Sequence, residues 1–164
     1  MESAKRIHGI PESVSPRICL LSSSGGHLLH LLLLKGYWEK RDRFWVTFDK
    51  EDARGLLEGE KMFPCRFPTN RNIRNLFRNF AVAARILYKE KPDILISTGA
   101  AVAVPFFVLG KLMGKKLVFV EVFDRVDGLT LTGKLVYRLA DLFIVQWEEA
   151  ARKYKRAVCL GSIF

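Results

Sequence analysis

The sequence predicts an α/β fold, a Rossmann-like doubly wound parallel sheet. Short apolar runs typical of buried strands alternate with helical stretches from residue 17 to the end of the chain, which is typical of a parallel sheet covered on both faces. A length of 164 residues suits one ordinary domain with its own core. A content of 49% hydrophobic and 27% charged residues indicates a globular chain. We therefore expect a single domain over residues 17–164, preceded by a flexible polar leader at residues 1–16.

The elements follow one another in a regular order. The expected strands are "RICLLS", "RFWVTF", "CRF", "PDILIS", "KLVFVE", "DLFIVQ" and "AVCLG". Helices are expected near His27–Lys35, within residues 49–62, at Asn72–Lys89, and in "GAAVAVPFFVLGKLMG", "TGKLVYRLA" and "EEAARKY". In the apolar helix, Pro105 lies near the first turns and Gly114 at the end, as helix boundaries favour. Neither long apolar stretch, "LLHLLLL" or "AAVAVPFFVLG", reaches the length of a bilayer span.

The charge of the chain narrows the class of partner. A formal net charge of +10 favours nucleic acid, an anionic membrane face or a phosphorylated substrate. The 3 cysteines are widely spaced, so neither a metal site nor a disulfide framework is expected. A reduced cytosolic compartment fits this cysteine usage, and the polar N-terminus does not resemble a signal peptide.

Polar and glycine-bearing stretches follow four of the expected strands. They are "SSSGGH", "STGAA", "EVFDRVDGLTLTG" and "QWEE". Ligands of open α/β sheets bind outside the carboxyl ends of the strands. We therefore expect the functional site where these four stretches meet.

The loop "SSSGGH" is the first candidate. Gly25 and Gly26 permit positive φ and a close backbone approach, and the following helix start could hold an anion on its free N–H groups. A tight strand-to-helix turn is the simpler alternative. The loop matches neither the dinucleotide fingerprint nor a P-loop. His27 could act as a general base, since its ordinary pKa is close to the operating pH, or it could merely cap or pack; His30 is expected to pack.

Two further strand ends carry candidate residues. "STGAA" repeats the pattern of hydroxyls plus glycine, and Thr98 could either bind a ligand or cap the following helix. In "EVFDRVDG", the Glu121 carboxylate could take a proton from a sugar hydroxyl or bind it, and Arg125 could face a phosphate. A solvated charged loop is the alternative.

The helix at Asn72–Lys89 is expected to be basic and amphipathic. At about 100° per residue, one sector holds Arg71, Arg74, Arg78, Arg85 and Lys89, and the opposite sector holds Ile73, Leu76, Phe77, Phe80, Ala84 and Leu87. Such a helix either packs its apolar face in the core and leaves its arginines in water, or presents them to anionic headgroups or a lipid diphosphate.

Several segments together resemble a known family. "SSSGGH", "TNRNIRNLFRN", "KPDILISTGAAVAVPFF", "LVFVEVFDRVDGLTLTGKLVYRLADLFIVQWEE" and "CLGSIF" resemble the PssD-like proteins of bacterial exopolysaccharide and capsule synthesis. Those proteins are similar to the membrane-anchoring subunit of the eukaryotic dolichol-linked UDP-GlcNAc transferase. The resemblance covers residues 17–164, and "SSSGGH" is shared more loosely with MurG-type glycosyltransferases.

This resemblance implies the N-terminal, acceptor half of a GT-B glycosyltransferase. The chain would belong to a two-chain inverting enzyme that transfers a sugar from a UDP-sugar to a polyprenyl-diphosphate-linked saccharide. A PssE-like chain would supply the donor-binding half. Attachment to the cytoplasmic face of the membrane would be peripheral, and neither a cofactor nor a metal is implied.

The resemblance also suggests roles for residues. His27 or Glu121 would be the catalytic base, with the choice left open. The expected substrate-binding residues are Ser23, Ser24, Gly25, Gly26, Ser97, Thr98, Gly99 and Arg125, and the expected membrane contacts are Arg71, Arg74, Arg78 and Arg85. Two other functions stay open: a non-catalytic membrane scaffold for a self-sufficient partner and, less well supported, a basic nucleic-acid-binding α/β domain.

Overall fold

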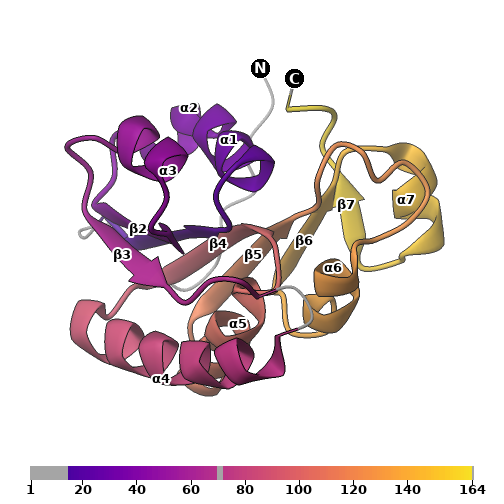
Figure 1. The fold of residues 1–164 in the computed structure, drawn as a ribbon. Coiled ribbons are helices and arrows are strands. Elements are labelled where there is room, and N and C mark those ends of the chain that lie inside the picture. Colours follow the sequence, from indigo (N-terminus) through magenta and orange to yellow (C-terminus); the bar gives the residue numbers. More distant parts are fainter. Residues whose placement is uncertain (1–14, 70–71, 164) are drawn as a thin grey trace.

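The computed structural model of the chain describes residues 15–69 and 72–163. The expected leader, apart from Ser15 and Pro16, and the expected membrane contact Arg71 lie outside these residues. A single sheet of 7 strands has the order β3-β2-β1-β4-β5-β6-β7, and every neighbouring pair is parallel. Figure 1 shows helices on both faces of this sheet. The expected Rossmann-like α/β class is therefore confirmed.

The strands are β1 (Ile18–Ser22), β2 (Arg43–Phe48), β3 (Met62–Cys65), β4 (Ile94–Gly99), β5 (Lys116–Val120), β6 (Leu142–Val145) and β7 (Ala157–Cys159). The helices are α1 (Gly26–Leu33), α2 (Lys35–Trp38), α3 (Glu51–Leu56), α4 (Ile73–Glu90), α5 (Ala103–Leu112), α6 (Leu131–Val136) and α7 (Glu148–Lys153). Strand β3 lies earlier than the expected "CRF". It contains Pro64, which an edge strand tolerates because one side of its backbone has no ladder partner.

Two apolar cores lie on the two faces of the sheet. Alternate strand residues such as Leu20 and Trp45 pack under α1, α2 and α3, whereas Phe44 and Phe119 pack against α4 to α7. In Figure 1, α1 to α3 lie above the sheet and α4 to α6 below it. Because both faces of the inner strands β1, β2, β4 and β5 are buried, these strands read as mostly apolar runs.

The strand order reverses between β1 and β4. The chain builds β1, β2 and β3 in one direction and then returns through α4 to place β4 beside β1. The ends of these two strands lie next to each other, with Ser22 opposite Gly99. Loops diverge from such a point and leave a crevice at the carboxyl ends of the strands.

The inward face of α4 differs from the expected one. Asn75 and Asn79 are buried, while Ile73 and Phe77 are each 69% exposed. The amide of Asn75 donates to the carbonyl of Pro68 (2.9 Å), and Asn79 bonds both backbone groups of Arg66. The alternative in which the whole apolar face of this helix packs in the core does not hold for Ile73 and Phe77, because the first half of α4 uses its inner face to satisfy backbone groups of residues 66–68. Leu87, in the second half, is buried as expected.

Replacing Asn79 with alanine is expected to destabilise the fold. Asn79 accepts from Arg66 N (2.8 Å) and donates to Arg66 O (3.1 Å) while fully buried. Asn79→Ala leaves both groups without these bonds and should lower the free energy of unfolding by about 2 kcal/mol in urea denaturation. Arg74→Ala, on the exposed face of the same helix, should change it by less than about 0.5 kcal/mol. Equal effects would show that the Asn79 bonds contribute nothing specific.

Candidate functional site

A cleft lies at the carboxyl edge of the sheet, between the start of α1 and the loop that follows β5. It has a volume of about 390 Å³ and is lined by Gly26, His27, His30, Val122, Phe123, Asp124, Arg125 and Thr130. The structure therefore brings together three of the expected site residues, Gly26, His27 and Arg125. Arg125 is half-exposed and lies 3.8 Å from the Asp124 carboxylate.

His27 is held by two hydrogen bonds to one residue of β4. Its Nδ1 lies 2.7 Å from the carbonyl oxygen of Thr98, and the Thr98 hydroxyl donates to the His27 carbonyl at 2.6 Å. A carbonyl oxygen can only accept, so Nδ1 of the neutral ring carries the proton and Nε2 keeps its lone pair. Burial lowers the pKa of His27, and the Thr98 carbonyl and Asp124 partly oppose this shift. A neutral imidazole with a bare Nε2 is the form that a general base requires.

The segment Ser97–Gly99 supports the imidazole from below. Gly99 has φ of 108°, and a β-carbon there would lie 3.0 Å from Cε1 of His27. The Gly99 N–H donates to Ser97 Oγ (3.0 Å), and its carbonyl accepts from Ser23 N (3.0 Å). Ser97 and Thr98 are fully buried. These side chains fix the position of His27 and do not line the cleft.

Of the two alternatives for Thr98, capping of the next helix does not occur. Residue Val102 occupies the N-cap position of α5 and makes no side-chain cap bond. The Thr98 hydroxyl is bonded to the first turn of α1 instead. The alternation of hydroxyl and glycine in "STGAA" thus reflects contact with the "SSSGGH" loop.

The glycine loop already holds a negatively charged group. Gly25 has φ of 77°, and its N–H donates to the carboxylate of Asp52 at 2.7 Å. Asp52 lies in the first turn of α3, and nothing in the sequence around it indicates this contact. Gly26 is exposed, lines the cleft and has open space where a β-carbon would be. The loop can therefore accommodate an anion at the start of α1. Ser24 is half-buried beside it, and Ser23 is buried.

Glu121 is separated from the cleft. It is 1% exposed, and its carboxylate accepts from Val122 N (3.1 Å), Thr130 N (3.0 Å) and Thr130 Oγ1 (3.0 Å). The absence of a side chain at Gly133 leaves room for this carboxylate. Burial raises the pKa of Glu121, and the hydrogen bonds from Val122 and Thr130 oppose that rise. The two base candidates thus differ: His27 lines the cleft, whereas Glu121 closes the loop of residues 122–130 onto α6.

Three further residues contribute to the site in ways that the sequence did not indicate: His30, Gln146 and Trp147. His30, expected only to pack, is half-buried and lines the cleft one turn after His27; burial, and to a smaller degree His27, lower its pKa. From the "QWEE" segment, Gln146 donates to the Glu121 carbonyl (2.9 Å) and Trp147 to the Phe123 carbonyl (2.6 Å). This segment was expected at the site, and it acts by holding the loop after β5.

Residues 15–69 and 72–163 contain neither a metal-ligand cluster nor a membrane-spanning helix. In that part of the chain, no three His, Cys, Asp or Glu side chains converge in the manner of a metal site. None of its helices combines the length and the hydropathy needed to cross a bilayer. The basic residues Arg74, Arg78 and Arg85 are exposed along α4, outside the lining of the cleft.

The titration of His27 is expected to be displaced downward. Burial disfavours the imidazolium, so NMR titration should give His27 a midpoint below its ordinary value of 6.5. The unfolded chain then binds a proton that the folded chain does not, so this contribution to stability is present above about pH 6.5 and is lost as the pH falls. A His27→Asn variant assigns the resonance. A midpoint at or above 6.5 would contradict the buried, neutral ring.

Solved structures with the same fold are larger than this chain. MurG from Acinetobacter baumannii is 15% identical with a TM-score of 0.67, covering 82% of this chain and 43% of that one. UDP-N-acetylglucosamine 2-epimerase from Rickettsia bellii is 15% identical with a TM-score of 0.72, covering 91% and 45%. The chain thus spans less than half of either structure. It matches one half of these GT-B folds, as predicted.

The relatives found by sequence similarity include ALG14 proteins from mammals and yeast. The UDP-N-acetylglucosamine transferase subunit ALG14 of Rattus norvegicus is 27% identical over 189 residues, 96% of this chain and 88% of that protein. The human protein of the same name is 28% identical, over 92% and 86%, and that of Schizosaccharomyces pombe is 42% identical over 77 residues, 44% and 37%. Residues 66–163, more than half of the chain, match the family described as oligosaccharide biosynthesis protein Alg14 like. The chain belongs to this Alg14-like family.

Proposed function

We propose that this chain is the acceptor-binding subunit of a two-chain, inverting glycosyltransferase. It would act in the transfer of a sugar from a UDP-sugar to a polyprenyl-diphosphate-linked saccharide. The observation that carries the proposal is His27, held neutral with a bare Nε2 at the cleft of one GT-B half. The relatives named as UDP-N-acetylglucosamine transferase subunits support glycosyl transfer shared with another chain. The resemblance to PssD-like proteins supports a place in bacterial exopolysaccharide or capsule synthesis.

His27 is the proposed base. Its Nε2 accepts the proton of the acceptor hydroxyl while that oxygen bonds to C1 of the donor sugar. The bond between C1 and the UDP oxygen breaks, UDP leaves with the electron pair, and the configuration at C1 inverts. The carbonyl of Thr98 stabilises the imidazolium through Nδ1–H, and the low pKa favours release of the proton afterwards.

The cleft offers one set of groups for phosphates. Gly26 and Arg125 line it beside His27, where backbone N–H groups and a guanidinium suit the diphosphate of the UDP-sugar. Ser97, Thr98, Gly99 and Glu121 act indirectly, by positioning His27 and the loop after β5. UDP-sugar is a substrate here, and most of its site would come from a PssE-like partner that supplies the second half of the GT-B fold.

The helix α4 is the proposed membrane contact. Its exposed row Arg74, Arg78 and Arg85 runs beside exposed apolar side chains, among them Phe77 (69%) and Tyr88 (77%). A basic row beside an apolar one suits the surface of an anionic bilayer. We propose that residues 17–164 form one acceptor- and membrane-binding domain attached peripherally to the cytoplasmic face.

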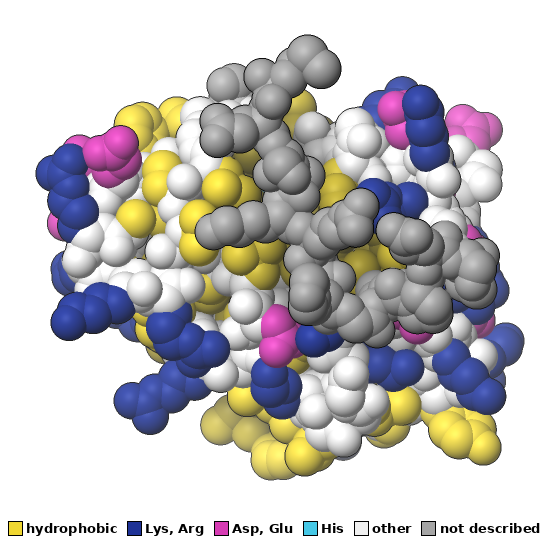
Figure 2. All heavy atoms as spheres, turned by 180° about the vertical axis from the view of Figure 1, so that it is seen from behind, with side chains coloured by type: hydrophobic (Ala, Val, Ile, Leu, Met, Phe, Trp, Pro, Cys, Tyr) yellow, Lys and Arg dark blue, Asp and Glu magenta, His cyan; other side chains and the backbone are white. Residues whose placement is uncertain are grey.

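Basic side chains are not confined to α4. Figure 2 shows lysines and arginines spread over the face seen from behind, with hydrophobic side chains along its lower edge. A test of the membrane contact therefore needs a control with the same change in charge at another place.

Transfer should require both chains and His27. Radiolabelled sugar is followed from a panel of UDP-sugars to a polyprenyl-diphosphate-linked saccharide, with this chain alone, the partner alone and both. We expect activity only in the mixture, and a fall in kcat of about 10²- to 10⁴-fold for His27→Gln. Lys40→Gln, exposed and outside the cleft, is the control.

Other outcomes would favour different functions. Activity from the partner alone, unaffected by His27→Gln in the mixture, would make this chain a membrane scaffold. Full activity of this chain alone would contradict a two-chain enzyme. If Glu121→Gln, correctly folded by circular dichroism, lost as much kcat as His27→Gln with the same pH profile, the positioning role of Glu121 would be wrong.

Neutralising two arginines of α4 is expected to weaken membrane binding. Each basic residue near an anionic surface contributes about 1 kcal/mol, so Arg74→Gln with Arg78→Gln should lower partition onto phosphatidylglycerol vesicles about 30-fold. Lys115→Gln with Arg138→Gln carries the same charge change away from α4 and should have a much smaller effect in the same sedimentation assay. Equal losses would mean that net charge alone is responsible.

A further inference from the structure

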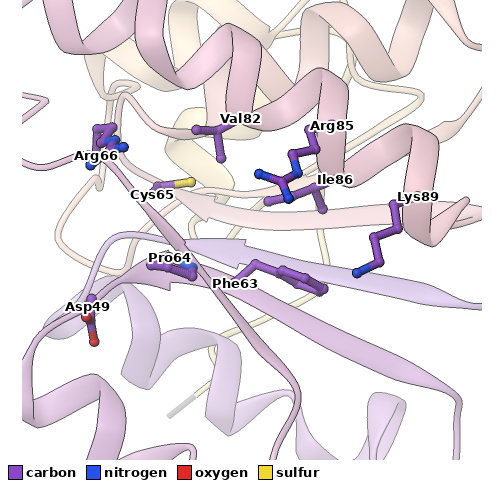
Figure 3. A pocket seen from close by; sticks show the side chains of 9 residues that line it. All are labelled: Asp49, Phe63, Pro64, Cys65, Arg66, Val82, Arg85, Ile86 and Lys89. Carbon is purple, nitrogen blue, oxygen red and sulfur yellow. The ribbon is translucent and has the colours of Figure 1, made fainter.

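A groove runs along the outer edge of the sheet, between strand β3 and helix α4. It has a volume of about 510 Å³, within the range of small-molecule sites. Its apolar lining includes Phe63 from β3 with Val82 and Ile86 from α4, and its cations are Arg66, Arg85 and Lys89. Figure 3 shows Arg85 and Lys89 extending from α4 over this lining, with Arg66 at the far end. The groove is thus apolar along its length and positively charged above.

Arg66 and Arg85 have no acidic partner in the part of the chain that the structure describes, whereas Lys89 is attracted to the adjacent Glu90 carboxylate. Across residues 15–69 and 72–163, no carboxylate forms an ion pair with Arg66, Arg85 or Lys89. The one acidic residue of the lining, Asp49, is bonded instead to Arg54 Nε at 2.6 Å. The charges of Arg66 and Arg85 are therefore uncompensated, and an anion would gain charge-assisted hydrogen bonds from both guanidinium groups.

The positive region continues beyond the groove. A neighbouring hollow of about 400 Å³ shares Arg66 and Val82 with the groove and adds Arg78. On the other side of this basic row lie the exposed apolar residues of α4, Ile73, Phe77 and Tyr88. The cations therefore stand between the groove and the surface that we assign to the membrane.

The groove also lies close to the glycine loop. Cys65 and Arg66 mark the carboxyl end of β3, two strands away from the end of β1. At the usual spacing of parallel strands this is about 10 Å. The strand between them is β2, and helix α3, which follows β2, bonds Gly25 through its Asp52. A ligand anchored by its phosphates at Arg66 would therefore have its remaining end near the cleft of His27.

We propose that this groove binds the polyprenyl diphosphate of the lipid-linked acceptor. Its diphosphate meets Arg66 and Arg85, and its first isoprenoid units lie on Phe63, Val82 and Ile86, with Lys89 at the end of the groove opposite Arg66. The identity of the lipid rests on the proposed function, whereas the preference for an amphipathic anion rests on the groove itself. A free phosphate would leave the apolar lining unused, and a neutral isoprenoid would leave Arg66 and Arg85 unpaired.

The test measures binding to the chain without its partner. Tritiated farnesyl diphosphate, a short soluble member of the class, is used in equilibrium dialysis, with inorganic diphosphate and farnesol as competitors. We expect farnesyl diphosphate to bind at least about tenfold more tightly than either competitor. Arg66→Gln with Arg85→Gln should weaken binding about tenfold or more, whereas Arg138→Gln with Lys155→Gln, exposed elsewhere and equal in charge change, should not.

A second variant tests the groove without removing a cation. Val82→Glu places a carboxylate in the half-buried lining and should abolish binding while circular dichroism stays unchanged. Three results would overturn the proposal: equal losses in the two charge variants, equal binding of inorganic diphosphate, or displacement of the probe by phosphatidylglycerol at the same concentration as by unlabelled farnesyl diphosphate. The last would indicate a general phospholipid groove.

The assay uses neither UDP-sugar nor the partner, so its failure can be distinguished from failure of the proposed function. If the chain binds the probe but supports no transfer, the proposal for the groove stands and the proposed enzymatic function is wrong. If the complex transfers sugar but the chain does not bind the probe, the proposed enzymatic function stands and the proposal for the groove is wrong.

Discussion

The two hydrogen bonds between His27 and Thr98 join the parts of the chain that make the site. They connect the first turn of α1 to the end of β4, across the point where the strand order reverses. The same contact fixes the ring tautomer, because the Thr98 carbonyl can only accept. It also explains Gly99, since a β-carbon there would press on the imidazole. This one contact thus determines where the His27 ring lies and which ring nitrogen carries the proton, and it explains why residue 99 is a glycine.

The opposite edge of the sheet is fastened by buried charge. Glu90, at the end of α4, is 3% exposed and bonds Arg17 before β1 and Lys61 before β3, both at 2.7 Å. The hydrogen bond from Lys61, reinforced by the charges of both cations, lowers the pKa of Glu90. Removing one partner of such a buried group is costly. The charged residues at the amino edge of the sheet therefore stabilise the fold, whereas Gly26 and Arg125 at the carboxyl edge line the cleft.

The fold could be predicted from the sequence because its determinants are local. Strands buried on both faces give continuous apolar runs. Their alternation with helices predicts a parallel sheet covered by helices on both faces. The resemblance to a known family indicated one half of a GT-B enzyme. A cleft is present at the edge where the site was expected, since the carboxyl ends of parallel strands share one edge.

The finer geometry of the site depends on contacts between distant residues. The sequence did not indicate that Asp52 bonds Gly25 or that Thr98 reaches His27, since the partners lie 27 and 71 residues apart. Periodicity grouped Ile73 and Phe77 with the apolar face of the helix, because it cannot detect that the backbone of residues 66–68 needs Asn75 and Asn79 on the inner face. The sequence also could not decide whether His27 or Glu121 is the base. Only the fold shows that Thr130 donates hydrogen bonds to the Glu121 carboxylate and so holds it away from the cleft.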